Sequence, residues 1–221
     1  EGISEACETL NTPVVSGNVS FYNETKGEAI YPTPVLGMVG VMKNVDNATS
    51  LSFKDEDDLI YLIGETKTEI GGSEYLSTIH GLEKGLPPEI DLDQEKELQE
   101  MVLSLIESGK IKSAHDTADG GLAVALAESC IQGESGAEIT LENPENIRDD
   151  ALLFGESVSR IIITIDKSHK DDIEKELDQT DLNYQKLGQV KGENLVINND
   201  INLKINKLKN RWERTIPCYV K

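Results

Sequence analysis

The sequence predicts a mixed α/β fold of the α+β type, in which helices pack on one face of a mixed sheet. Segments rich in aliphatic and β-branched residues alternate along the chain with amphipathic segments of helical period. The connections between these segments vary in length, and several neighbouring strands are close enough to form hairpins. These features favour a mixed sheet over a doubly wound parallel sheet.

The chain is expected to begin with the end of a helix, because Ile3, Cys7 and Leu10 recur at helical spacing before the stop at Pro13. A short buried strand, interrupted by a polar loop, is then predicted over residues 14–22. Residues 31–34 contain two prolines, which stiffen the backbone and remove two donors. We therefore place a domain boundary there and predict domains at 1–32 and 33–221.

Beyond this boundary, the β-rich segments 35–45 and 58–65 predict buried strands. A short helix capped by Ser73 is expected up to residue 82. The segment 93–108 predicts a longer helix with a strongly acidic outer face. A short strand is expected to end at 114–116. Further strands are expected at 137–141, 160–166, 187–190, 195–197 and 201–205, and further helices at 122–131, at 170–178 and from Asn206.

The charge of the chain excludes two classes of partner. It carries 21 Lys and Arg against 41 Asp and Glu, a net charge of −20, which argues against nucleic acid or an anionic membrane. The hydrophobic fraction of 38% is sufficient for a buried core. The charge is uneven, because residues 186–221 hold eight basic and three acidic side chains, so that this tail is basic and the remainder strongly acidic.

Cysteine usage and chain ends indicate the setting of the protein. Cys7, Cys130 and Cys218 are too few and too far apart for a disulfide framework or a Cys-x-x-Cys metal site, which favours a reduced, cytoplasmic location. No apolar run approaches the roughly 20 residues that span a bilayer. The chain starts inside a predicted helix without an initiator Met, so we expect it to be part of a longer protein.

The most distinctive local sequence is Ser16-Gly17-Asn18-Val19-Ser20. A glycine at this place lets a phosphate approach the backbone, and the Asn18 amide oxygen suits a hard cation that already carries phosphate. Ser20 would point to the same side as Asn18 if a strand resumes there. The alternative is a polar turn in which Ser16 and Asn18 hydrogen-bond to their own backbone.

Three other motifs admit a functional and a structural interpretation. The run 115–121 (HDTADGG) could hold Mg²⁺ and phosphate, or Asp119 could cap a helix that Gly120 and Gly121 let pack closely. Glu156 and Arg160 could orient a ligand or pair with each other. Residues 64–75 contain a Gly-Gly turn at a helix start. This turn could bind an anion, or its glycines could be needed only for the backbone conformation of the turn. His115 has no ligand partner at zinc spacing, and no phosphate-binding P-loop, dinucleotide or hydrolase motif occurs.

Taken in order, these stretches resemble the synthetase subunit family of phosphoribosylformylglycinamidine synthases, within the superfamily of aminoimidazole ribonucleotide synthase. The sequences that carry the resemblance are PVVSGNVSFYNET at 13–25, YPTPVLGMVG at 31–40, IGGSEY at 70–75, HDTADGGLAVALAE at 115–128 and LFGESVSR at 153–160. The resemblance implies that 1–32 ends an ATP-site domain and that 33–221 is the closing α/β domain.

The resemblance also implies a reaction and site roles. The family converts formylglycinamide ribonucleotide to the amidine with ATP and glutamine-derived ammonia, through an iminophosphate, and works with a glutaminase subunit and a small accessory subunit. It implies that Gly17 contacts ATP, that Asn18 is a ligand of Mg²⁺ and that Ser20 binds substrate. The family's catalytic histidine and most Mg²⁺ carboxylates lie in the earlier half of the subunit, so this chain is expected to hold no catalytic residue.

Two other interpretations remain open from the sequence. The chain could belong to another enzyme of the superfamily, such as aminoimidazole ribonucleotide synthase, although Tyr22-Asn23-Glu24 favours the synthetase. It could also act as a non-catalytic scaffold or interaction domain. For Asp116, Asp119, Glu156 and Arg160 we expect a structural role or a remnant of a second, non-catalytic nucleotide site.

Overall fold

A computed structural model of the chain describes residues 1–20, 23–143, 145–198 and 200–219, with no side chains described beyond residue 214. The chain divides into two units, Glu1–Ala48 and Thr49–Lys221, so that residues 33–48 group with the N-terminal unit. Phe21 and Tyr22, which belong to the predicted first strand, lie outside the described residues, as does the side chain of Cys218.

The N-terminal unit contains little regular structure. Helix α1 (Gly2–Thr9) confirms the predicted helix. Strands β1 (Glu24–Thr25) and β2 (Glu28–Ala29) form a short antiparallel hairpin that was not predicted, and the 3-10 turn η1 covers Val45–Asn47. No described residue of residues 1–48 is buried.

The strand predicted over 35–45 is wrong for this chain, and so is the first strand as far as residues 14–20 describe it. Both segments are irregular, and side chains such as Val35 and Val39 are 94% and 97% exposed. The residues have strand composition, but a strand forms only when another strand pairs with it and an apolar layer covers it. The described part of residues 1–48 gives neither of these two segments a partner strand or an apolar cover.

The C-terminal unit is built on a seven-stranded mixed sheet with the order β4-β6-β3-β7-β5-β8-β9. All neighbouring pairs are antiparallel except β5 and β8, which confirms the predicted mixed sheet. The strands are β3 (Leu59–Ile63), β4 (Ile111–Asp116), β5 (Ala137–Ile139), β6 (Ile161–Ile165), β7 (Tyr184–Val190), β8 (Asn194–Ile197) and β9 (Ile201–Lys204).

The helices of this unit follow the predicted order with one addition. They are α2 (Glu74–His80), α3 (Leu92–Glu107), α4 (Gly121–Gly133), α5 (Asp149–Phe154), α6 (Lys170–Leu177) and α7 (Ile205–Tyr219), with the 3-10 turn η2 at Lys167–His169. Ser73 caps α2 as expected, because its hydroxyl accepts from the Leu76 N–H at 3.3 Å. Helix α5 was not predicted, since six residues are too few to show a helical period.

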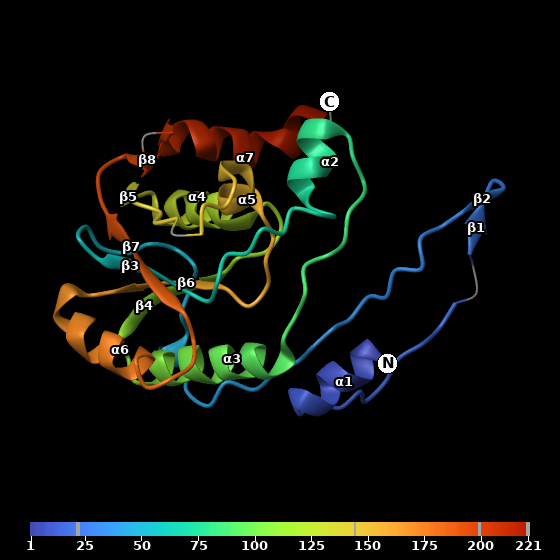
Figure 1. Cartoon of the computed structure of the whole chain (residues 1–221), viewed down its shortest axis with the longest axis horizontal. Helices are drawn as coiled ribbons and strands as arrows, with labels where there is room; N and C mark the ends of the chain where they lie inside the picture. Colours follow the sequence, from blue (N-terminus) through green and yellow to red (C-terminus); the bar gives the residue numbers. More distant parts are fainter. Residues whose placement is uncertain (21–22, 144, 199, 220–221) are drawn as a thin grey trace. The chain divides into compact units, whose positions relative to one another are not determined.

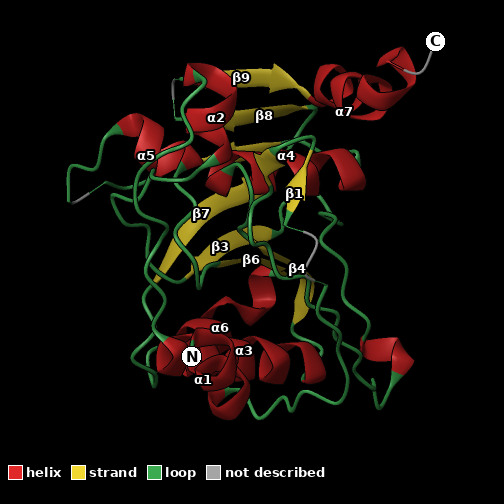
Figure 2. Cartoon of the chain, turned by 90° about the vertical axis from the view of Figure 1, so that its right-hand side faces the viewer, coloured by secondary structure: helices red, strands yellow, loops and turns green. Residues whose placement is uncertain are grey.

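Helices cover both faces of the sheet, which corrects the prediction that they pack on one face. All five residues of β3 are buried. Ile60 and Leu62 join a core with α4 and α5, whereas Leu59, Tyr61 and Ile63 join a second core with α3 and α6. Figures 1 and 2 show α4, α5 and α7 on one side of the strands and α3 and α6 on the other. Hairpin-like connections alone do not show how many faces a sheet buries.

No helix within the described residues has both the length and the apolar character that crossing a bilayer requires.

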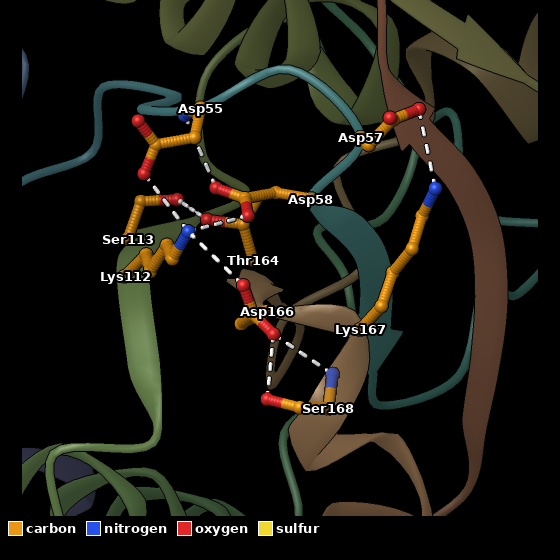
Figure 3. Close-up of polar contacts among 9 residues, drawn as sticks. All are labelled: Asp55, Asp57, Asp58, Lys112, Ser113, Thr164, Asp166, Lys167 and Ser168. Atoms are coloured by element: carbon orange, nitrogen blue, oxygen red, sulfur yellow. Dashed lines mark hydrogen bonds and ion pairs between the residues drawn. The ribbon is translucent and has the colours of Figure 1, made fainter.

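One lysine connects three segments at an end of the sheet (Figure 3). Lys112 on β4 donates to Asp58 at 2.7 Å and to Asp55 at 2.8 Å, and lies 3.7 Å from Asp166. Asp58 is only 2% exposed. Partial burial opposes the charge of Lys112, but the hydrogen bonds to both aspartates outweigh it and hold its pKa above the ordinary value. The side chain therefore neutralises a buried carboxylate.

Replacing Lys112 by Met should destabilise the chain by about 3 kcal/mol, because the Asp58 charge would stay buried without its partner. Urea denaturation followed by circular dichroism would measure this. Lys54→Met is the matched control, since Lys54 is exposed and its hydrogen bonds go to the Ser50 and Ser52 hydroxyls, so the change should alter stability by less than about 0.5 kcal/mol. The double variant Lys112→Met, Asp58→Asn should recover part of the lost stability, because the buried charge is then removed. Equal stability of Lys112→Met and the parent would contradict the role of Lys112 in neutralising Asp58.

Candidate functional site

The predicted ATP and metal segment is open in the N-terminal unit. Gly17, Asn18 and Ser20 are all exposed and lie in irregular backbone. A Cβ built on Gly17 would have nothing within 4 Å, so its backbone is accessible. These residues are therefore available to a ligand, but they are not brought together with any other predicted site residue within this unit.

In the C-terminal unit, by contrast, three of the predicted motifs meet around Arg160. This residue directly precedes β6 and is 1% exposed. Its guanidinium donates from Nε to the Ser157 carbonyl at 2.8 Å and from Nη2 to the Gly155 carbonyl at 2.7 Å. Nη1 donates to Thr66 Oγ1, just beyond β3, at 3.0 Å. Arg160 thus fixes the turn 155–160 and attaches it to the segment that leads to α2.

Glu156 extends this arrangement to two helix starts. Its Oε1 accepts from the Gly120 N–H at 2.8 Å and from the Glu74 N–H at 2.9 Å. Gly120 is the N-cap of α4, and Glu74 is the first residue of α2. The first N–H groups of a helix have no partner within it and carry partial positive charge. The Glu156 carboxylate therefore stabilises the starts of both α2 and α4. Glu156 occupies the position at which an external anion was considered.

Close packing explains the glycines of these motifs. Gly121 has φ +71°, and a Cβ there would lie 2.6 Å from the Gly155 carbonyl oxygen. Gly64 has φ +104°, and a Cβ there would lie 2.1 Å from the Ser159 carbonyl oxygen. Both positions require glycine, because the backbone has a positive φ and because there is no space for a Cβ atom. The rings of Tyr75 and Phe154 stack beside them with centroids 5.2 Å apart.

Several sequence interpretations are corrected here. Glu156 and Arg160 form no ion pair with each other in the part of the chain that is described; Glu156 binds backbone N–H groups instead. Asp119 does not cap α4, whose N-cap is Gly120 without a side-chain hydrogen bond. Asp116 is exposed and lies 3.6 Å from His115 Nδ1. The predicted pair and the predicted cap are therefore both absent from the described residues, and Glu156 and Arg160 instead hold backbone groups.

The electrostatics of the junction also indicate a structural role. Burial lowers the pKa of Arg160 to about 10, and the negative charges of Glu69 and Glu156 act against that shift. His115 Nε2 lies 2.9 Å from Glu128 Oε2 on α4, which links β4 to that helix. Among the described residues, no group of three or more His, Cys, Asp and Glu could hold a metal ion. The contacts of Arg160 and Glu156 thus hold these segments together.

Thr66 and Ser157 are the junction residues that the sequence did not single out. Ser157 Oγ accepts from the Lys67 N–H at 3.2 Å, and Thr66 is the side-chain acceptor for Arg160. Neither position stands out by spacing, because the two residues are 91 positions apart in the sequence and the pairing of β3 with β6 brings their segments together. Their polarity close to a strand, after β3 for Thr66 and before β6 for Ser157, was the only available signal.

Two family models match the chain in the order of its units. The model described as AIR synthase related protein, C-terminal domain, matches residues 55–198, and the model of the N-terminal domain matches residues 1–42. The fold and the junction therefore define a C-terminal domain of this type. The chain belongs to the AIR synthase related protein family.

Curated relatives specify the resemblance further. The chain is 48% identical over 219 residues to the phosphoribosylformylglycinamidine synthase subunit PurL of Caldanaerobacter subterraneus subsp. tengcongensis, a match that covers 97% of this chain. It is 44% identical over 221 residues to the same subunit of Alkaliphilus metalliredigens, covering 98% of this chain. In both cases the chain spans only 30% of the relative's length.

Solved structures share the fold. Thermotoga maritima PurL complexed with FGAR matches with a TM-score of 0.64 and 22% identity, covering 75% of this chain and 30% of that one. The hydrogenase maturation protein HypE of E. coli matches with a TM-score of 0.50 and 18% identity, covering 71% of this chain and 51% of that one.

Replacing Glu156 by Ala should destabilise the chain by about 2 kcal/mol, because two helix N–H groups lose a charged acceptor. Glu156→Gln should cost less, since its carbonyl oxygen can still accept. Urea denaturation of the parent and both variants would measure the order.

Asp119→Ala is the matched control, because the sequence suggests a capping role that the structure does not show. Its stability should stay within about 0.5 kcal/mol of the parent. A larger loss for Asp119→Ala than for Glu156→Ala would show that the acceptor at α4 is wrongly assigned.

Proposed function

We propose that this chain is the C-terminal part of an ATP-dependent ligase, phosphoribosylformylglycinamidine synthase, which makes the amidine from formylglycinamide ribonucleotide, ATP and glutamine-derived ammonia. The observation that carries the proposal is the 48% identity to a PurL subunit over 97% of the chain. In this proposal, residues 1–32 close an ATP-site domain and residues 33–221 form the C-terminal domain of the subunit.

The exposed segment at Gly17 is the proposed ligand-binding part of the chain. Its backbone has open space where a phosphate of ATP would approach, and the exposed Asn18 amide provides an oxygen that suits Mg²⁺. Ser20 provides a hydroxyl for the substrate. When bound, Mg²⁺ would neutralise phosphate charge on ATP. Asn18 is one ligand only, so the other ligands would come from residues outside this chain.

The proposed partners are those of the synthase complex. A Thermotoga maritima structure described as PurLQS supports assembly of this subunit type with two others, and T. maritima PurL has been crystallised with ATP. For this chain we propose a glutaminase subunit and a small accessory subunit as partners, and a cytoplasmic location.

Fusion to a relative offers a direct test. The chain would replace the matching C-terminal segment of the Caldanaerobacter subunit, and the chimera would be assayed for ATP-dependent amidine formation with ammonia. We expect the chimera to be active and the chimera with Asn18→Ala to lose at least about tenfold in rate, because a metal ligand is removed. The isolated 221 residues should show no activity.

Asn206→Ala is the control in the same chimera, since it removes an exposed amide from the start of α7 without touching the proposed segment. It should keep parental activity. An inactive but folded chimera would count against the proposed function. Activity that is unaffected by Asn18→Ala would count against Asn18 as a metal ligand. Amidine formation by the isolated 221 residues would contradict the proposal that they need the rest of the subunit.

An interaction role of the N-terminal unit is supported by a separate observation. The segment 35–42 (VLGMVGVM) has no charged residue, and its Val, Leu and Met side chains are exposed. An apolar segment of strand composition is normally covered by a sheet or by another chain. In the proposed subunit, the ATP-site domain would cover it.

Without that cover, the 221-residue chain should self-associate through this segment. Analytical ultracentrifugation should show oligomers for residues 1–221 and a monomer for residues 49–221, which contain both cores. Introducing Val39→Lys into the full chain should reduce the association, because a charge on an edge segment opposes pairing. A monomeric parent chain at tens of micromolar would contradict this expectation.

A further inference from the structure

An apolar groove lies between α4 and α7, which pack side by side (Figure 1). Its volume is about 410 Å³. Apart from Glu128 and Arg211, the lining is aliphatic or aromatic and includes Ala127, Ile131, Leu195, Leu203, Leu208 and Trp212. The groove belongs to the C-terminal unit alone and reaches the motif region at Phe154 and Glu128, which line it as well.

Helix α7 supplies the outer wall of this groove. Leu208 and Trp212 are four residues apart and therefore lie on one face of the helix. Leu208 packs against the core, whereas Trp212 is 53% exposed. A half-exposed tryptophan at the edge of an apolar groove is typical of a binding surface.

Next to this apolar face, α7 and the residue before it are basic. Lys204, Lys207 and Arg214 are exposed, and none of them forms an ion pair with a described residue. A second hollow beside the groove is lined by Lys204, Asn206, Lys207, Asn210 and Arg211. Positive charge therefore follows the groove along its α7 side.

This charge is exceptional in the molecule. The chain carries −20 in total, and most exposed helices, including α3 and α6, are acidic. A basic rim beside an apolar groove is complementary to a polypeptide that has apolar side chains on one face and carboxylates next to them. A membrane surface rich in phosphate is disfavoured for two reasons. The net negative charge of the chain repels it, and the apolar side chains line a hollow instead of projecting into a lipid layer.

We propose that the groove between α4 and α7 binds an acidic amphipathic helix of a partner polypeptide. The apolar face of that helix lies against Trp212 and Leu208, and its carboxylates lie against Lys204, Lys207 and Arg214. The proposal needs only the C-terminal unit and does not depend on the proposed ligase function.

A synthetic peptide with the sequence of residues 91–108 (DLDQEKELQEMVLSLIES) provides a defined acidic amphipathic probe. Trp212 is the only tryptophan of the chain, so its fluorescence reports on the groove directly. We expect saturable binding with a blue shift of the Trp212 emission. The same peptide with its Asp and Glu changed to Asn and Gln should bind about tenfold more weakly.

Variants of the full chain locate the binding, with a fluorescein-labelled peptide and anisotropy as the readout. Lys207→Glu should weaken binding about tenfold because it reverses a charge on the rim. Lys175→Glu, the same change on exposed α6 across the sheet, is the matched control and should bind as the parent does. Trp212→Ala should abolish saturable binding while the thermal midpoint stays within a few degrees of the parent.

Three outcomes would overturn the proposal. These are no saturable binding of the acidic peptide, equal weakening by Lys207→Glu and Lys175→Glu, or a Trp212 blue shift with phosphatidylcholine–phosphatidylserine vesicles but not with the peptide. The last result would assign the groove to a membrane surface instead.

Discussion

The buried guanidinium of Arg160 is a constraint on which several parts of the C-terminal unit depend. Enclosing a charged side chain costs free energy, and three hydrogen bonds to oxygen atoms offset that cost only if the turn 155–160 keeps its shape. That shape places Glu156 against the first N–H groups of α2 and α4. The positions of two helices therefore follow from one arginine.

The sheet depends on the same kind of mutual support. Strand β3 is buried on both faces and pairs with β6 and β7, so neither core can be removed without exposing it. Lys112 completes this arrangement at one end by neutralising the buried carboxylate of Asp58. The C-terminal unit thus contains both hydrophobic cores, whereas the N-terminal unit has no buried residue among those described.

This difference between the units bears on function. The proposed ATP and Mg²⁺ segment lies in the unit that lacks a core, which agrees with a chain that spans 30% of its curated relatives. A ligand site needs groups held in fixed positions, and an exposed irregular segment cannot hold them by itself. The C-terminal unit, in contrast, presents a rigid surface, and its basic α7 differs in charge from the rest of the molecule.

Periodicity in the sequence was sufficient to predict α1, α3, α4, α6 and the central strands, because these signals depend on residues close together in the chain. The motifs that meet at Arg160 could be recognised, but not their connections. The acceptor for the α4 start is Glu156, 36 residues away, rather than the adjacent Asp119. Likewise, strand composition at 35–45 did not produce a strand. Pairing, burial of both sheet faces and capping from a distance depend on which segments the fold brings together, and local sequence carries no record of that.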